Sequence, residues 1–404
     1  MRRWLIGLFA LLLVAAAAFF LLAPGIIERG TNKIDGKPLL HVSDHAKALH
    51  KTLTIVDLHS DSLLWSRNFL NRATRGHMDL PRLEEGNVAL QILSSTTKAP
   101  KGQNYDANSG DTDIITALAI AQLQPVRTWN SLLERSLWHA EKLHRAAQKS
   151  GTELWPIAAQ KDIDTLLLAR SIGTSKTKSG VIVSRPPVGA MLSIEGLHNL
   201  EGDINNLDKL YAAGFRMAGI THFFDNEFAG SMHGLKKGGL TPLGREVVRR
   251  METMGMIVDV AHCSHACVAD ILKMARRPVV SSHGGVQATC KVNRNLSDDE
   301  IRGVAATGGV VGIGYWDAAV CDTSPASVAR AMKHVRDLVG IQYVALGSDY
   351  DGATTVRFDT SKLVQVTEAL IEAGFTDDEI RAAMGGNAIR VLRAGLVPLT
   401  PPAP

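Results

Sequence analysis

The sequence predicts an α/β protein, a (β/α)8 TIM barrel preceded by an N-terminal transmembrane or signal-anchor helix. Three observations support this prediction. Eight short apolar runs of strand length follow one another between residues 54 and 347, and segments with helical patterning lie between most of them. The chain also begins with a long uncharged apolar run. An open doubly wound sheet is the alternative, but no GxGxxG or Walker loop follows any of the apolar runs.

Length and composition are compatible with one large domain. The 404 residues fit either two average domains or one barrel, and a content of 45% hydrophobic and 21% charged residues allows a large core. The net charge of +4 is small and spread along the chain, so nucleic acid is not an indicated partner. The four cysteines include no CxxC pair, which excludes a zinc finger. An exported domain would permit a disulfide between Cys290 and Cys321, although the sequence alone does not establish one.

Residues 1–29 are predicted to be a membrane anchor or a signal segment. Arg2 and Arg3 precede an apolar run of the roughly 20 residues that a helix needs to span a bilayer. This positive flank predicts that the N-terminus lies in the cytoplasm and the bulk of the chain on the other side of the membrane. A cleaved signal peptide is the alternative, because the alanines at 15–18 and Ala23 offer small residues. The unusual length of the apolar run favours an uncleaved anchor.

The barrel is expected to extend over residues 30–395, followed by a Pro-rich tail at 396–404. An amphipathic helix at 44–52 leads into the first strand. Thr241-Pro242 is a favourable helix start, and the segments that begin at Ser297 and Thr376 read as capping boxes. The eight strands are expected at Thr54–Leu58, Val88–Leu93, Gly189–Ile194, Arg216–Thr221, Met256–Ala261, Val279–Ser282, Val310–Gly314 and Val344–Gly347.

One connection, residues 94–188, is too long for a simple loop and is predicted to be an elaborated second βα crossover. It contains a Gly/Ser/Lys-rich patch at 98–110, helix-like runs at 132–149 and 161–170, and a second patch at 173–184 that is rich in Ser, Thr and Lys. We expect its loops to cover the site partly, because such insertions often determine substrate choice in barrels.

Residue types that bind metals end six of the eight predicted strands. His59 and Asp61 follow the first strand, and in an extended chain residues i and i+2 point the same way. Because the carboxyl ends of parallel barrel strands meet at one face, side chains at these ends are expected to converge. The remaining strand ends carry Glu195, His222, His262, His283 and Asp349.

This set of donors is larger than one zinc ion needs. Two carboxylates, Asp61 and Glu195, and three or four imidazoles exceed the four ligands of a tetrahedral zinc, one of which is usually water. A pair of ions about 3.5–4 Å apart accommodates the set. Glu195 is the natural bridge, because a carboxylate has two oxygens to share and no predicted strand ends in lysine. The bridged water would be acidified toward neutral pH and become the nucleophile.

Ten motifs in the order of the chain resemble the membrane (renal) dipeptidase family of zinc peptidases. The resemblance covers roughly residues 54–393, and the set is more specific than any single motif. The motifs are DLHSD (57–61), GHMDLPRL (76–83), LSIEG (192–196), THFFDN (221–226), LTPLGREVV (240–248), DVAHCS (259–264), SSHGG (281–285), NRN (293–295), GSDYDG (347–352) and GGNAIRVL (385–392).

The resemblance implies a (β/α)8 barrel that holds two zinc ions. By position, His59 and Asp61 would bind the first ion, His262 and His283 the second, and Glu195 would bridge them.

The same resemblance assigns further roles. Asp349 matches the residue that takes and returns the proton of the attacking water, and His222 matches the one that polarises the scissile carbonyl or steadies its oxyanion. Arg294 matches the residue that binds the terminal carboxylate of the substrate, a role that suits a bidentate guanidinium. Cys290 and Cys321 align with an intramolecular disulfide of the mammalian members.

We therefore expect a zinc-dependent dipeptidase that acts on small dipeptides, including those with a D-residue at the carboxyl side. Membrane attachment with the catalytic domain outside the cytoplasm, and a homodimer, are also expected. A related deacylase or β-lactam hydrolase is the first alternative. A non-catalytic envelope binding protein is the second, and the presence of His222 and Asp349 beyond the ligand set weakens it. The preferred side chains and chirality stay open, because residues 94–188 show little resemblance to the family.

Overall fold

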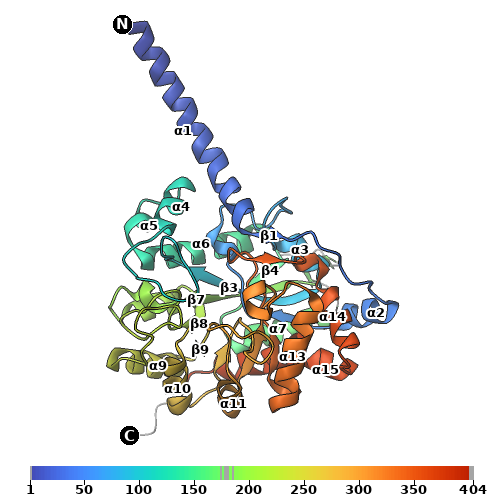
Figure 1. The fold of residues 1–404 in the computed structure, drawn as a ribbon. Helices are drawn as coiled ribbons and strands as arrows, with labels where there is room; N and C mark the ends of the chain where they lie inside the picture. The colour runs from blue at the N-terminus through green and yellow to red at the C-terminus, as the bar shows by residue number, and fades with distance from the viewer. Residues whose placement is uncertain (1, 173–174, 177–181, 184–185, 400–404) are drawn as a thin grey trace.

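The structure, a computed structural model, describes residues 2–172, 175–176, 182–183 and 186–399 (Figure 1). Eight parallel strands form a closed barrel in chain order, because β3 pairs with both β2 and β7. The predicted (β/α)8 fold is therefore confirmed. The barrel strands are β2 (Ile55–Asp57), β3 (Val88–Thr96), β7 (Val188–Glu195), β8 (Phe215–Gly219), β9 (Ile257–Asp259), β10 (Val280–Ser281), β11 (Val310–Ile313) and β12 (Val344–Leu346).

The observed strands overlap all eight predicted runs but differ from them in length. Most are shorter, because the chain turns away from the sheet before the apolar run ends. The exceptions are β7, which exceeds its predicted run by one residue at each end, and β3, which continues past the predicted Leu93 to Thr96 and stays in register with β7, where Thr96 faces Glu195. A further strand, β4 (Leu154–Pro156), pairs with the amino end of β7 outside the barrel.

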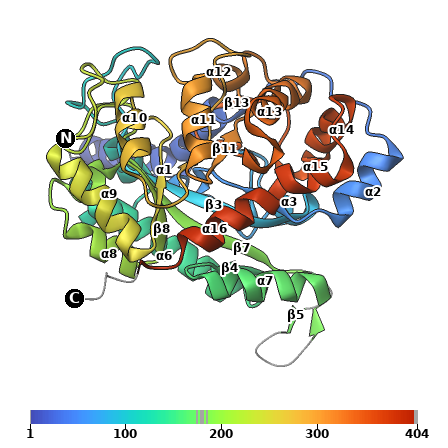
Figure 2. The same ribbon diagram turned by 90° about the horizontal axis from the view of Figure 1, so that it is seen from below.

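Helices surround the barrel and close its amino end. Within the interior, Ile92, Met217 and Ile257 belong to one apolar cluster that continues into α7 and α16. Figure 2, the view from below, shows α16 crossing in front of the strands and α7 beside β4. The helices are α2 (Asp44–Thr52), α3 (Leu80–Glu85), α4 (Ile115–Ala121), α5 (Arg127–Asn130), α6 (Leu132–Ser150), α7 (Gln160–Ile172), α8 (Asn206–Ala212), α9 (Pro242–Met254), α10 (His265–Met274), α11 (Asp298–Ala306), α12 (Asp317–Val320), α13 (Pro325–Val339), α14 (Val364–Glu372), α15 (Asp377–Arg381) and α16 (Asn387–Gly395).

Helix starts follow the predicted caps. The side chain of Thr241 accepts a hydrogen bond from the backbone of Gly244 and begins α9, with Pro242 in its first turn. The capping boxes that begin at Ser297 and Thr376 are both present. Each of these caps satisfies backbone N–H groups that the first turn of a helix leaves free.

The long crossover after β3 contains α4 to α7 and β4. The loop between β3 and α4 lines the cavity at the carboxyl face of the barrel, as predicted for the patch at 98–110. The second predicted patch, 173–184, falls largely outside the described residues. Its described parts, β5 (Ser175–Lys176) and β6 (Ile182–Val183), pair with each other in antiparallel orientation.

The N-terminal segment is one continuous helix, α1 (Arg2–Thr31), which projects from the barrel in Figure 1. It is long and apolar enough to cross a membrane, with a mean hydropathy of 2.9 over its most apolar 18 residues. After α1, the short strand β1 (Lys33–Ile34) pairs in parallel with β13 (Thr355–Val356), which lies just beyond β12. The base of α1 is thus attached to the carboxyl face of the barrel.

Candidate metal centre

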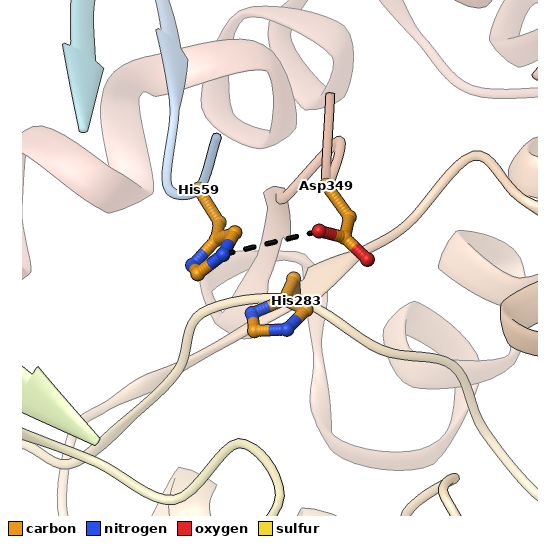
Figure 3. A group of neighbouring side chains, drawn as sticks. All are labelled: His59, His283 and Asp349. Carbon is orange, nitrogen blue, oxygen red and sulfur yellow. Dashed lines mark ion pairs between the residues drawn. The ribbon is translucent and has the colours of Figure 1, made fainter. Parts of the chain in front are cut away.

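The carboxyl ends of the barrel strands bring the predicted donors into one buried cluster. His59 and Asp61 follow β2, and Glu195 is the last residue of β7. Figure 3 shows His59, His283 and Asp349 of this cluster, which come from three separate strand ends and point toward one another. Each side chain in the set is almost fully shielded from solvent; the set is His59, Asp61, Glu195, His222, His262, His283 and Asp349.

Glu195 is shared between two groups of potential metal ligands. Its Oε1 lies 3.1 Å from Nε2 of His262 and 3.4 Å from Nε2 of His283. The same carboxylate, with His59 and Asp61, forms a second group whose ligand atoms all lie within 4.8 Å of one another. A carboxylate that belongs to both groups can serve as a bridge between two ions.

The hydrogen bonds of His283 identify which of its nitrogens is free to bind a metal. Ser282 Oγ donates to Asp259 Oδ2 at 2.5 Å, so this hydroxyl accepts from Nδ1–H of His283 at 2.8 Å. The proton therefore resides on Nδ1, and the lone pair of Nε2 faces Glu195 and His262. Such outer hydrogen bonds to serine and carboxylate fix the tautomer of metal-binding histidines.

His59 lies among three carboxylates. Its Nε2 is 3.5 Å from Glu195 Oε1, 3.8 Å from Asp61 Oδ1 and 3.9 Å from Asp349 Oδ1. Burial opposes a charge on His59, but the carboxylates, Glu195 first, raise the pKa of His59 to about 10. Both ring nitrogens are buried without a hydrogen-bond partner in the described part of the chain. The site therefore favours a cation at this point, and a metal ion placed between these donors would supply it.

The imidazoles of His262 and His283 are held neutral. Burial lowers the pKa of His262 and of His283 well below the ordinary value, and nearby cationic side chains lower both further. Burial alone would raise the pKa of Glu195, but the surrounding imidazoles, His222 first, hold it well below its usual range. Neutral imidazoles and an ionised carboxylate are the forms that bind divalent metals, so the donor set fits the zinc centre that was predicted.

Three further predicted residues line the cavity above this cluster. The cavity has a volume of about 510 Å³ and reaches Asp349, His222 and Arg294. The guanidinium of Arg294 is buried and donates to the carbonyl of His283 at 2.8 Å. Its other N–H groups face a site of the size that takes small ligands.

Asp349 occupies a strained turn that keeps its carboxylate at the centre. Its φ of 58° lies in the left-handed region, where Asp and Asn are the most tolerated side chains after glycine. A side chain at Gly352 would place its Cβ 2.1 Å from Asp349 Oδ1. The Asp-Tyr-Asp-Gly turn therefore needs glycine at its end. Burial raises the pKa of Asp349 well above its usual value, although His59 opposes this shift.

Sequence reasoning missed Thr96, because the apolar pattern of β3 stops before it. Thr96 Oγ1 lies 2.7 Å from Asp61 Oδ1 and 2.5 Å from Glu195 Oε2, so it holds the two carboxylates relative to each other. It also missed the apolar wall that Trp65, Tyr105 and Phe223 contribute to the cavity.

Two of the four cysteines form a disulfide, and the other two are free. Cys290 and Cys321 form a disulfide, as the resemblance implied. Cys263 and Cys267 are buried and free, and neither belongs to the groups of potential ligands.

A barrel with carboxylates and neutral imidazoles gathered at its carboxyl face defines a metal-dependent hydrolase class. Residues 43–396 match the family model described as membrane dipeptidase (peptidase family M19). The chain belongs to this family of metallo-dipeptidases. A curated relative, the dipeptidase aclJ of Aspergillus oryzae, is 28% identical over 372 residues, which are 86% of this chain and 80% of the relative.

Solved structures share the fold. The probable dipeptidase PvdM of Pseudomonas aeruginosa superposes with a TM-score of 0.70 at 20% identity, over 87% of this chain and 98% of the other. A metallo peptidase of Rhodobacter sphaeroides, liganded with a phosphinate mimic of the dipeptide L-Ala-D-Ala, gives a TM-score of 0.64 at 22% identity, over 85% of this chain and 99% of the other.

Proposed function

We propose that this enzyme is a membrane-anchored dipeptidase with two zinc ions bridged by Glu195. The observation that carries the proposal is that the Glu195 carboxylate belongs to two groups of potential ligands, one with His262 and His283 and the other with His59 and Asp61. When bound, the two ions would polarise the scissile carbonyl and lower the pKa of a water molecule. The side chains of the chain itself perform the remaining tasks.

Three residues orient the substrate and move its protons. Arg294 binds the terminal carboxylate of the dipeptide, and its burial strengthens this interaction because water does not compete for it. His222 donates a hydrogen bond to the carbonyl oxygen as negative charge develops there. Asp349 accepts the proton of the attacking water and returns it to the leaving amine, a task for which a carboxyl with a raised pKa is suited.

The substrate class follows from the relatives and the cavity. We propose small dipeptides, including those with a D-residue at the carboxyl side. The bound phosphinate mimic of L-Ala-D-Ala in the Rhodobacter sphaeroides structure supports this inclusion. The apolar wall formed by Trp65, Tyr105 and Phe223 favours an apolar side chain in at least one of the two positions.

We propose that α1 is retained as a membrane span, with Arg2 and Arg3 in the cytoplasm and the barrel outside it. The hydropathy and exposure of α1 support a span, and the positive N-terminal flank supports the orientation. The disulfide between Cys290 and Cys321 supports export, because such bonds persist in oxidising compartments.

The test of the proposed centre separates metal binding from catalysis. Purified wild-type protein should carry about two zinc ions per chain and lose hydrolysis of L,L- and L,D-dipeptides when a chelator removes them. Asp349→Asn should retain the metal and lose about 10²–10⁴-fold in kcat, the typical contribution of a general base. Asn also tolerates the left-handed turn, so the fold should persist.

The exposed Asp299→Asn is the matched control and should leave kcat unchanged. An Asp349→Asn protein with wild-type turnover would contradict the role of Asp349. A wild-type protein that binds one ion or none would contradict the bridged pair.

A further inference from the structure

The base of α1 is fixed to the barrel by buried charges. Glu28 is 1% exposed, and its two oxygens accept from Arg67 Nε at 3.0 Å and from Arg75 Nε at 2.6 Å. Arg67 also pairs with Asp351, which lies in the same turn as Asp349. Breaking one member of such a buried set leaves an uncompensated charge, so α1 is held in one orientation. The anchor is therefore part of the catalytic face.

The membrane boundary on α1 can be placed by counting residues. About 20 residues of helix cross the hydrocarbon core, so a span that starts near Trp4 ends near Ala23–Ile27. Two residues of this part of α1, Phe19 and Ile27, line the same cavity that contains the metal centre. The mouth of the cavity thus reaches the level at which α1 leaves the membrane.

Exposed apolar side chains lie at this level on the crossover. Helix α4 contacts α1 and shares the cavity wall with it, and Figure 1 shows α4 and α5 beside the base of α1. Three side chains that flank α4 are largely exposed: Ile114 by 49%, Leu123 by 67% and Val126 by 70%. Nothing in the described part of the chain covers them.

We propose that the segment from Ile114 to Val126 rests in the interface of the bilayer that α1 spans, so that the active-site cavity opens at the membrane surface. The inference depends on the proposed anchoring. Apolar side chains beside a transmembrane helix gain stability at the boundary between headgroups and acyl chains. The exposed Arg29 and Lys33, which follow the span, meet lipid phosphates there.

The apolar side chains, and not net charge, support the proposal. The nearby loop carries exposed Asp106 and Asp111 as well as Lys101, so this face is not uniformly basic. A docked protein partner would require a comparable apolar surface, but the continuity with α1 favours lipid as the occupant.

The depth of single side chains in a bilayer tests the proposal. The full chain is reconstituted in vesicles of phosphatidylethanolamine and phosphatidylglycerol, and a nitroxide is attached to Leu123→Cys or Val126→Cys. Leu168→Cys is the matched control, because Leu168 is 61% exposed and lies on α7 at the opposite end of the barrel. Leu12→Cys reports on the span itself. The unmodified chain measures the background labelling of Cys263 and Cys267, which are buried.

At each position, the relaxation of the nitroxide by oxygen, which concentrates in lipid, is compared with its relaxation by a water-soluble nickel chelate. Labels at 123 and 126 should give an oxygen-to-nickel accessibility ratio several-fold above that at 168 and below that at 12, because position 12 lies in the middle of the span. The label at 12 could lie in lipid while the labels at 123 and 126 are as accessible to nickel as the label at 168. That result would overturn the proposal that residues 114–126 face the membrane, but not the proposed anchoring by α1. A label at 12 in water would overturn both this inference and the anchoring. The measurement requires no turnover, so a failure of the proposed dipeptidase chemistry would be seen separately.

Discussion

Replacing Arg294 by methionine tests whether the substrate carries a free carboxylate. Methionine keeps most of the length of the side chain and removes the charge and the donors. In the described part of the chain the Arg294 guanidinium makes one hydrogen bond, to the carbonyl of His283, and approaches the ring of Trp316 at 6.0 Å. A buried cation without a carboxylate partner is an arrangement that an anionic substrate would complete.

The size of the effect follows from that burial. Arg294 is 2% exposed, so its bond to a carboxylate is shielded from solvent. Truncating one partner of such a hydrogen-bonded charge pair costs about 2–5 kcal/mol. At 1.4 kcal/mol per factor of ten, kcat/KM for a dipeptide should fall about 30- to 4,000-fold. The kcat/KM of Arg294→Lys should lie between those of the wild type and Arg294→Met, because lysine keeps the charge but lacks the bidentate fork.

The assay compares each dipeptide with its C-terminal amide. In the wild type the amide should be hydrolysed less efficiently than the free acid by the same 30- to 4,000-fold, and in Arg294→Met the two substrates should differ by about threefold or less. The rate on the amide also serves as a control, because it shows whether loss of the bond to the His283 backbone disturbs the metal centre. Zinc content is measured on the same samples.

Two results would refute this reasoning. Equal hydrolysis of acid and amide by the wild type would favour the deacylase alternative, because such an enzyme has no carboxylate to recognise. A strong preference for the acid that persists in Arg294→Met would place carboxylate recognition on another residue.

Two predictions concern stability, measured by urea unfolding of the full chain in detergent. The disulfide between Cys290 and Cys321 closes a loop with a sequence separation of 31. Replacing both cysteines by serine should therefore lower the free energy of unfolding by about 3–4 kcal/mol. An unchanged urea midpoint would argue against the bond. Buried His50 is bonded to Thr367 and to the carbonyl of Gly86, and burial lowers its pKa to about 4. Below the ordinary pKa of 6.5, His50 binds a proton in the unfolded chain but not in the folded one. As the pH falls from 6.5 to 4, the free energy of unfolding should therefore decrease by about 3 kcal/mol more in the wild type than in His50→Gln. Parallel pH curves for the two proteins would contradict this assignment.

The strands and the metal-binding residues were predictable because local patterns encode them. Buried parallel strands are short apolar runs, and the first polar residue after such a run lies at the carboxyl face of a barrel. This rule is sufficient to gather His262, His283 and Glu195 without knowledge of the packing. The roles of these residues stay predictions.

Strand lengths were harder to predict, because apolarity changes where the barrel interior becomes the site. At the mouth of the barrel the interior contains ligands and substrate, so a strand that continues there carries polar side chains. β3 ends in Ser94-Ser95-Thr96, and an apolar criterion therefore stopped at Leu93 and lost Thr96. Conversely, the predicted run at 256–261 exceeded β9, because Val260 and Ala261 are buried in the turn that leads to His262.

The attachment of α1 was beyond local patterns altogether. In the sequence Glu28 is only the first charge after the apolar run, which is the usual sign that a span has ended. The structure instead buries Glu28 against Arg67, 39 positions away, and connects both to Asp351. A pairing between residues so far apart depends on the tertiary fold. It has a consequence that a flexible tether would lack: the buried pair fixes the barrel relative to the span. Under the proposed anchoring, the same face that holds Asp349 is directed toward the membrane, so the fold that builds the active site would also determine where its opening lies.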